Sequence, residues 1–234
     1  KQLNKLSVII KPSNFKSLLN NKILEGKLIS EIDVFLKEDG SLSNFITKGE
    51  VKDLKINLYK DLNLTKTNFG FFADKNDVLI KNIFGKLEDI KISDGDIKLN
   101  FDNGIKLNSN FNSQINFEEK NLNKYTKYLD KYDFVKNVKN LNAVLNNNFS
   151  INFDNTYKIK NYDYSFSGIL KKSKYKLTKP IKNEFLNKEI KEIYFTDLKT
   201  QAVLRPTGVK IDTEGKYSLN NLDFLKIKIN NYWN

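Results

Sequence analysis

Few residues of this chain are suited to catalysis or metal binding. The 234 residues include no histidine and no cysteine, which removes the usual general base, thiolate metal sites and disulfides. Asp94, Asp96 and Asp102 are the residue types of a cation site or of a carboxylate pair for glycoside chemistry. They coincide with predicted hairpin turns, where aspartate bonds nearby backbone, and they lack the ligand spacing of a calcium loop. We therefore predict no metal-binding residue.

Motifs for phosphate binding and nucleophilic catalysis are also missing. The sequence contains no GxGxxG, GxxxxGK[ST] or GxSxG, and its serines have no histidine to activate them. We predict no catalytic residue and no cofactor. The protein is expected to bind or carry something rather than to act as an enzyme.

The formal charge of +12 is carried by lysine, because Arg205 is the only arginine. Lysine supplies a point charge, whereas nucleic-acid sites rely on the bidentate contacts of arginine. Codons poor in G and C would also enrich lysine together with asparagine, isoleucine and phenylalanine. Nucleic acid is therefore not the expected partner. The candidates for contact with anionic lipid headgroups or another polyanion are Lys171, Lys172, Lys174 and Lys176.

The elements that must position these side chains are strands. Between residues 105 and 117, every second residue is apolar or serine and the residues between are lysine, asparagine or glutamine, which predicts a strand of about 40 Å with one apolar face. The preceding segment predicts a β-meander whose strands carry Ile90, Ile92, Ile97, Leu99 and Phe101. Turns are expected at Asp94-Gly95 and at 102–104.

A second block, at 141–166, repeats the alternation and changes phase near Asn161. We predict a bulge or turn there, because one extra residue restores the apolar face. Glycines precede several short strand-like runs, which predicts turns or bulges at strand entries; they are Gly26, Gly49, Gly85, Gly168 and Gly215.

Two segments have helical spacing instead. Residues 12–20 predict a short amphipathic helix capped by Ser13, and residues 118–132 predict a second one. The fold class is therefore mainly β, a long antiparallel meander sheet that is curved or groove-like, with a closed β-sandwich as the alternative. A possible subdivision is a first sheet block at 1–117, the helix at 118–132 and a second sheet block at 133–234.

The chain has no run of about 18 apolar residues, so we predict no transmembrane helix in this segment. It begins at Lys1 and stops after a strand-like run, and we expect a single β-rich segment, 1–234, of a longer protein.

The apolar face of such strands must be covered by another sheet, a helix or a ligand. Two short helices are too small to cover it, so lipid tails or a second sheet must supply the rest. Burial of an acyl chain gains about 0.8 kcal/mol per methylene. The residues predicted to line a lipid groove are Ile97, Leu99, Phe101, Ile105, Leu107, Phe111, Ile115, Phe117, Phe149, Ile151 and Phe153.

Long alternating strands, glycine-led runs and a mid-chain helix followed by further strands resemble the bacterial AsmA-like family, which includes TamB-type and YhdP-type envelope proteins. The resemblance extends over roughly residues 40 to 234 and is one of texture rather than of an exact motif. The segments that carry it are Gly49 to Leu58, Asn82 to Phe101, Gly104 to Ser113 and Tyr162 to Gly168.

The resemblance implies a non-catalytic segment of a periplasmic bridge-like protein. Such a protein carries or shields lipid acyl chains along an apolar β-groove between the inner and outer membranes of the cell envelope. The implied partners are a phospholipid or another envelope lipid and the rest of the same polypeptide at both ends. The implied anchor in the inner membrane lies outside this segment. The alternative is a closed β-sandwich that binds polyanions such as nucleic acid or anionic glycans.

Overall fold

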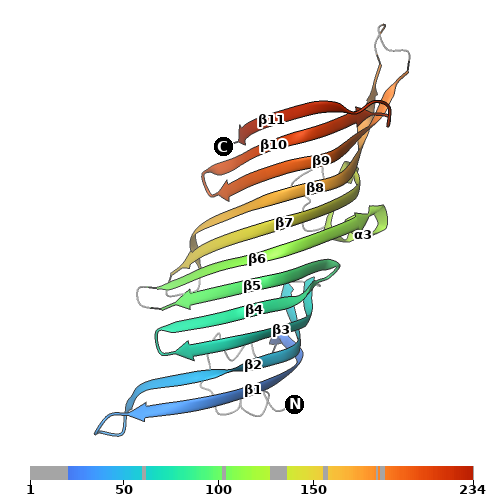
Figure 1. The fold of residues 1–234 in the computed structure, drawn as a ribbon. Helices are drawn as coiled ribbons and strands as arrows, with labels where there is room; N and C mark the ends of the chain where they lie inside the picture. The colour runs from blue at the N-terminus through green and yellow to red at the C-terminus, as the bar shows by residue number, and fades with distance from the viewer. Residues whose placement is uncertain are drawn as a thin grey trace. The chain divides into compact units, whose positions relative to one another are not determined.

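The computed structural model describes residues 21–59, 62–101, 104–126, 136–154, 158–182, 184 and 188–233. Most of them lie in strands whose order in the sheet follows the chain, each hydrogen-bonded to the next (Figure 1). The strands are β1 (Ile23–Leu36), β2 (Leu42–Tyr59), β3 (Leu62–Asp74), β4 (Asp77–Leu87), β5 (Ile90–Asn100), β6 (Ile105–Glu118), β7 (Val138–Phe153), β8 (Ile159–Ile181), β9 (Ile190–Arg205), β10 (Gly208–Leu219) and β11 (Leu225–Trp233).

This order confirms the predicted mainly β meander, and the long alternating run at 105–117 is indeed one strand, β6. The alternative, a closed β-sandwich, needs two sheets, whereas the described strands form one. β1 and β11 are the ends of this order, so each has one strand neighbour among the described strands.

The chain divides into two compact units. The N-terminal unit comprises Lys1–Phe111 and Asp154–Tyr157, and the C-terminal unit comprises Asn112–Phe153 and Lys158–Asn234. The division falls inside β6, so the first half of that strand belongs to one unit and the second half to the other.

One helix, α3 (Glu119–Thr126), is described in full. It follows β6 directly, as the helical spacing from residue 118 predicts, and residues 127–135 lie outside the described residues, as does the predicted helix at 12–20. Leu122 and Tyr125 are both buried. The Tyr125 ring stacks on that of Phe117 with 4.6 Å between their centroids. α3 therefore covers the end of β6 within the C-terminal unit.

Each of the strands β2 to β5 in the N-terminal unit contains one non-glycine residue in the left-handed region. These residues are Asp53, Lys66, Asn82 and Asp94, with φ between 50° and 55°. The pairing register shifts beside each of them, which is the signature of a β-bulge. A bulge reverses the parity of the residues beyond it, and apolar residues before and after it therefore stay on one face.

The bulge in β5 overturns one predicted turn. Asp94 and Gly95 lie inside a continuous strand, Ile90–Asn100, and not in a hairpin. The hairpin between β4 and β5 instead turns at Glu88 and Asp89. The second predicted turn, at 102–104, includes residues 102 and 103, which lie outside the described residues. The predicted irregularity near Asn161 is confirmed, because Asn152 pairs with Asn161 and the next residue, Phe153, pairs with Ile159.

Gly49, Gly85, Gly168 and Gly215 lie within strands, so their predicted place at strand entries is wrong. A Cβ atom at Gly49 or Gly168 would overlap the backbone oxygen of Ile29 or Val144 in the neighbouring strand. One at Gly215 would lie 2.6 Å from the backbone oxygen of Asp197. These glycines allow the backbones of adjacent strands to approach closely within the sheet.

Candidate functional site

The strands of the N-terminal unit keep their charged side chains on one face of the sheet, whereas apolar side chains lie on both faces. Directly paired residues share one face of a sheet and successive residues alternate. One face, called here the N-apolar face, carries the paired residues Leu28, Ile32, Val34, Phe45, Val51, Leu54, Phe69, Phe71, Ala73, Val78, Ile80, Ile83, Ile97 and Leu99. Every lysine, aspartate and glutamate at a paired position of β1 to β5 lies on the opposite face, the N-charged face.

The N-apolar face is most exposed at β1. Ile32 has 62% of its surface accessible, and its neighbours Leu28, Val34 and Leu36 are also exposed. Every residue of β1 after Ile23 is exposed. Further into the unit the same face is half-buried or buried, as at Phe69, Ala73 and Ile80. No described element covers its β1 end.

Six of the predicted groove residues belong to the N-terminal unit. Ile97 pairs with Ile80 and Leu99 pairs with Val78, which places both on the N-apolar face, half-buried. Phe101, directly after β5, is exposed and donates its backbone N–H to the Asn76 carbonyl at 2.9 Å. The three residues on β6 are half-buried in its alternating pattern; they are Ile105, Leu107 and Phe111.

The strands of the C-terminal unit show the same separation. Its C-apolar face carries Leu141, Ala143, Leu145, Asn147, Phe149, Ile151, Leu170, Phe166, Tyr164, Leu198, Ala202, Leu204, Val209, Ile211, Tyr217, Leu225, Ile227, Ile229 and Trp233. The charged residues at paired positions of β7 to β11 all lie on the opposite C-charged face. The alternation in the sequence predicted an apolar and a polar face for single strands. It did not show that bulges keep the apolar residues of each strand on one face.

The other five groove residues are in the C-terminal unit and are more enclosed. Phe117 is only 5% exposed beneath Tyr125, and Ile151 is also buried. Ile115, Phe149 and Phe153 are half-buried. The Phe149 ring meets the Tyr164 ring edge to face, with 6.1 Å between centroids. This part of the C-apolar face is closed by the protein's own side chains.

A buried polar cluster interrupts the C-apolar face, and sequence reasoning missed it. Asn147, 2% exposed, donates from Nδ2 to Ser113 Oγ at 3.0 Å. The Tyr164 hydroxyl donates to Asn147 Oδ1 at 2.8 Å, and burial raises the pKa of Tyr164. The available signal was Asn147 itself, a polar residue in phase with Leu145 and Phe149. The cluster is satisfied internally, as a buried amide must be.

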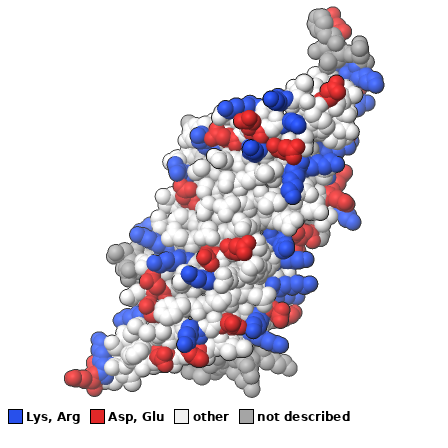
Figure 2. Space-filling view, in the orientation of Figure 1, with Lys and Arg blue, Asp and Glu red and all other residues white. Residues whose placement is uncertain are grey.

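The lysines predicted to contact lipid headgroups lie on β8, and one of them, Lys174, forms an ion pair within the protein. Lys174 donates to Glu192 at 2.8 Å and lies 5.4 Å from the centre of the Tyr194 ring. The Glu192 carboxylate, by accepting this hydrogen bond, raises the pKa of Lys174. Lys171, Lys172 and Lys176 are exposed. Blue and red atoms adjoin at several places in Figure 2, so some lysines there have acidic neighbours.

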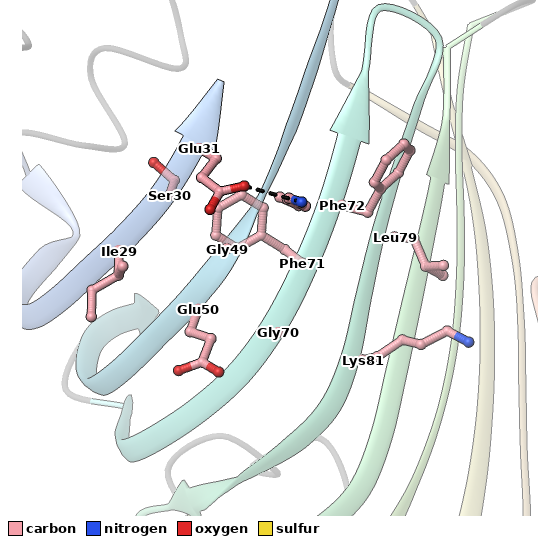
Figure 3. A pocket seen from close by; sticks show the side chains of 11 residues that line it. Ile29, Ser30, Glu31, Gly49, Glu50, Gly70, Phe71, Phe72, Leu79 and Lys81 are labelled. Carbon is pink, nitrogen blue, oxygen red and sulfur yellow. Dashed lines mark ion pairs between the residues drawn. The ribbon is translucent and has the colours of Figure 1, made fainter. Parts of the chain in front are cut away.

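An open hollow of about 680 Å³ lies on the N-charged face around Gly70, which has no side chain to fill it (Figure 3). Its rim includes Ile29, Phe72 and Leu79, together with an ion pair in which Lys48 and Glu31 are 3.0 Å apart. Gly70 is the one feature of the sequence that could have indicated this hollow. The hollow is open to solvent, and Glu31 and Lys48 on its rim neutralise each other, so we assign it no chemistry.

Asp94 and Asp96, two of the three aspartates considered for a cation site, do not form such a site with other described residues. Asp94 is the bulge residue of β5, and Asp96 accepts the backbone N–H of Asn82 at 3.2 Å; residue 102 lies outside the described residues. Among the residues that the structure describes, no group of three or more acidic side chains could hold a metal ion. None of the described helices is long and apolar enough to cross a membrane.

Comparison of the chain with known proteins found no matching family model, curated protein or solved structure.

Proposed function

We propose that this chain is a non-catalytic segment of a bridge-like envelope protein of the AsmA-like type, which carries or shields lipid acyl chains along its apolar sheet faces. The observation that carries the proposal is the complete separation of charge in both units. At every paired position of β1 to β5 and of β7 to β11, charged residues lie on one face only.

Charge-free faces support lipid binding because an acyl chain needs apolar contact and no polar recognition. Each buried methylene contributes about 0.8 kcal/mol, whereas a charged side chain in the same surface would have to lose its hydration. Monomeric proteins rarely leave a large contiguous apolar patch uncovered. The exposed residues Leu28, Ile32 and Val34 on β1 form the part of the N-apolar face that is open to lipid.

Lipid binding can be tested with two variants that differ only in the face they change. Ile32→Glu/Val34→Glu places two carboxylates on the N-apolar face of β1. Ile29→Glu/Phe35→Glu places two on the N-charged face of the same strand, at residues that are also exposed. We expect lipid to co-purify with the parent chain and to be detected by mass spectrometry. A fluorescent fatty acid should bind the first variant about tenfold more weakly and the second as well as the parent.

Two results would contradict the proposal: a parent chain without bound lipid that does not take up the fatty acid, or equal losses in both variants. Equal losses would mean that added negative charge, and not the apolar face, controls binding.

The envelope location is a separate part of the proposal and has its own test. The full-length protein should fractionate with the inner membrane, with this segment accessible to protease only after the outer membrane is opened. Recovery of the full-length protein in the cytoplasmic fraction would refute the location and leave the lipid-binding result standing.

A further inference from the structure

An open hollow of about 540 Å³ lies on the C-charged face, where the pairing of β9 with β10 shifts at a β-bulge. Side chains from β9, β10 and β11 line it. They include four lysines and two carboxylates, which leave a net charge of two positive; these residues are Lys199, Lys216, Lys226, Lys228, Asp197 and Glu214. The hollow belongs to a face of the sheet, so it does not depend on an unpaired strand edge.

The two carboxylates of the hollow already have partners. Glu214 lies directly opposite Lys199 on β9 and Lys228 on β11, so its negative charge is close to two lysines. Asp197, the left-handed residue of the bulge, accepts the Thr196 hydroxyl at 3.2 Å. Neither carboxylate lies at a position directly opposite the other two lysines of the hollow.

Those two lysines, Lys216 and Lys226, are the unbalanced part of the hollow. They lie directly opposite each other on β10 and β11, and both are exposed. Like charges at directly opposed positions destabilise a sheet. Their row continues through Thr196 to Lys172 on β8, so it contains three lysines and no acidic residue. The ion pairs among the described residues of this unit involve other lysines and Arg205.

The hollow on the N-charged face differs on this point, because Lys48 and Glu31 form an ion pair there. Around Lys216 and Lys226, an anion from outside the chain has to supply the balancing charge. A phosphate monoester suits them, since it carries a charge of about −1.5 to −2 at pH 7 and three acceptor oxygens. A carboxylate ligand brings only one negative charge, and a nucleic-acid site is expected to use arginine, which does not line the hollow.

We propose that the hollow over β9 to β11 is a binding site for a phosphate monoester, held between the ammonium groups of Lys216 and Lys226. Lys172, in the same row, adds further positive charge. The group recognised is the same whether the phosphate is free in solution or is the headgroup of a lipid. The proposal does not rest on lipid binding by the C-apolar face, because the site lies on the opposite face.

Glycerol 3-phosphate is the soluble probe, and isothermal titration calorimetry measures its binding to the 234-residue chain. We expect binding that weakens as sodium chloride is added. Lys216→Gln/Lys226→Gln should weaken it at least about tenfold. Both lysines are exposed, so this variant should fold like the parent, which circular dichroism checks.

A matched control removes the same charge from another opposed pair of lysines. Lys86 and Lys91 lie directly opposite each other on β4 and β5 in the N-terminal unit, and both are exposed. Lys86→Gln/Lys91→Gln should bind glycerol 3-phosphate as the parent does. Glu214→Gln has the reverse expected effect, about threefold tighter binding, because it removes a negative charge from the hollow.

Vesicles distinguish the two sources of the phosphate. Phosphatidylcholine vesicles that contain phosphatidic acid present the same phosphate monoester at a membrane surface, and pure phosphatidylcholine vesicles do not. Cosedimentation with the first kind only, lost in Lys216→Gln/Lys226→Gln, would identify a lipid headgroup as the ligand. Binding of glycerol 3-phosphate without cosedimentation would identify a free phosphate compound.

Three results would overturn the proposal. The first is a parent chain that binds neither glycerol 3-phosphate nor the vesicles with phosphatidic acid, and the second is equal weakening in the Lys86→Gln/Lys91→Gln control. The third is binding of a single-stranded oligonucleotide by a chain that does not bind glycerol 3-phosphate, which would make the lysines part of a nucleic-acid surface. Failure of the fatty-acid test of the apolar faces would leave all of these results unchanged.

Discussion

The apolar faces of the two units are closed to different degrees. In the C-terminal unit, α3 covers Phe117, and the Asn147 cluster ties β6, β7 and β8 together. In the N-terminal unit, the N-apolar face extends to β1, where Ile32 and its neighbours are exposed. The C-terminal unit therefore covers its apolar face over β6 to β8, although Leu225 and Trp233 on β11 are exposed, whereas no described element gives the N-terminal unit a comparable cover. The difference lies in the covering elements, not in the strands.

A large effect is expected from one of two glycines that have different surroundings. Gly168→Ala in the C-terminal unit would drive a Cβ into the backbone oxygen of Val144 and to 2.9 Å from the Leu145 Cα. We expect a loss of about 3 kcal/mol in the free energy of unfolding, measured by urea denaturation. Gly70→Ala in the N-terminal unit meets only the Gly49 oxygen at 3.8 Å and should change stability by less than about 1 kcal/mol. Similar losses at both sites would mean that the close approach at Gly168 is not present in solution.

The buried cluster should give the next largest effect. Asn147→Ala removes the acceptor of the Tyr164 hydroxyl and the donor to Ser113, and each group left unpaired in a buried site costs about 1–3 kcal/mol. Tyr164→Phe combined with Asn147→Ala in a double-mutant cycle should show a coupling of about 1 kcal/mol. Strict additivity of the two losses would show that the hydrogen bond contributes nothing to stability.

The sequence predicts the strands of both units better than it predicts what covers them. Alternation at 105–117 requires one apolar face, and β6 has it. In β5 the apolar residues shift from even positions, Ile90 and Ile92, to odd ones, Ile97 and Leu99. A turn and a bulge both produce that shift, and Asp94-Gly95 suits either, so local residue types alone did not distinguish them. Pairing with Ile80 and Ile83 on β4 decides it.

The other wrong or missing predictions concern residues whose contacts are distant in sequence. Gly168 looks like a strand entry until Val144, on the neighbouring strand, leaves no room for a side chain. In the sequence, Asn147 only interrupts the apolar pattern. In the structure, Ser113 and Tyr164 supply its hydrogen bonds. The alternation fixed the face of the predicted groove residues, but their exposure depended on α3, on the edge position of β1 and on the bulges.

A smaller effect is expected from ion pairs that differ in exposure. Glu192 in the C-terminal unit is 28% exposed beside Lys174, whereas Glu31 in the N-terminal unit is 75% exposed beside Lys48. Glu192→Gln should cost about 0.5–1 kcal/mol at neutral pH, and Glu31→Gln close to nothing.

The Glu192 effect should also depend on pH. The hydrogen bond from Lys174, followed by that from the Tyr194 hydroxyl, holds the pKa of Glu192 below its ordinary value of 4.5. The stabilisation is therefore present above that value and is lost as the pH falls through the lower, folded-state pKa. Urea denaturation of parent and Glu192→Gln at a series of pH values should show the two curves converging in acid. A constant difference down to low pH would rule out the charged pair as its source.

The smallest expected effect is at the open end of the N-apolar face. Because Ile32 is 62% exposed, Ile32→Thr should change the free energy of unfolding by less than about 0.5 kcal/mol in dilute protein. Leu198→Ala, at a buried position of the C-apolar face, should cost about 2–5 kcal/mol. A loss at Ile32 that approaches the loss at Leu198 would show that this part of β1 is covered in solution. If that loss grows with protein concentration, the cover is another copy of the chain, and if it persists at the lowest concentration, the face is closed within one chain and has no open end for lipid.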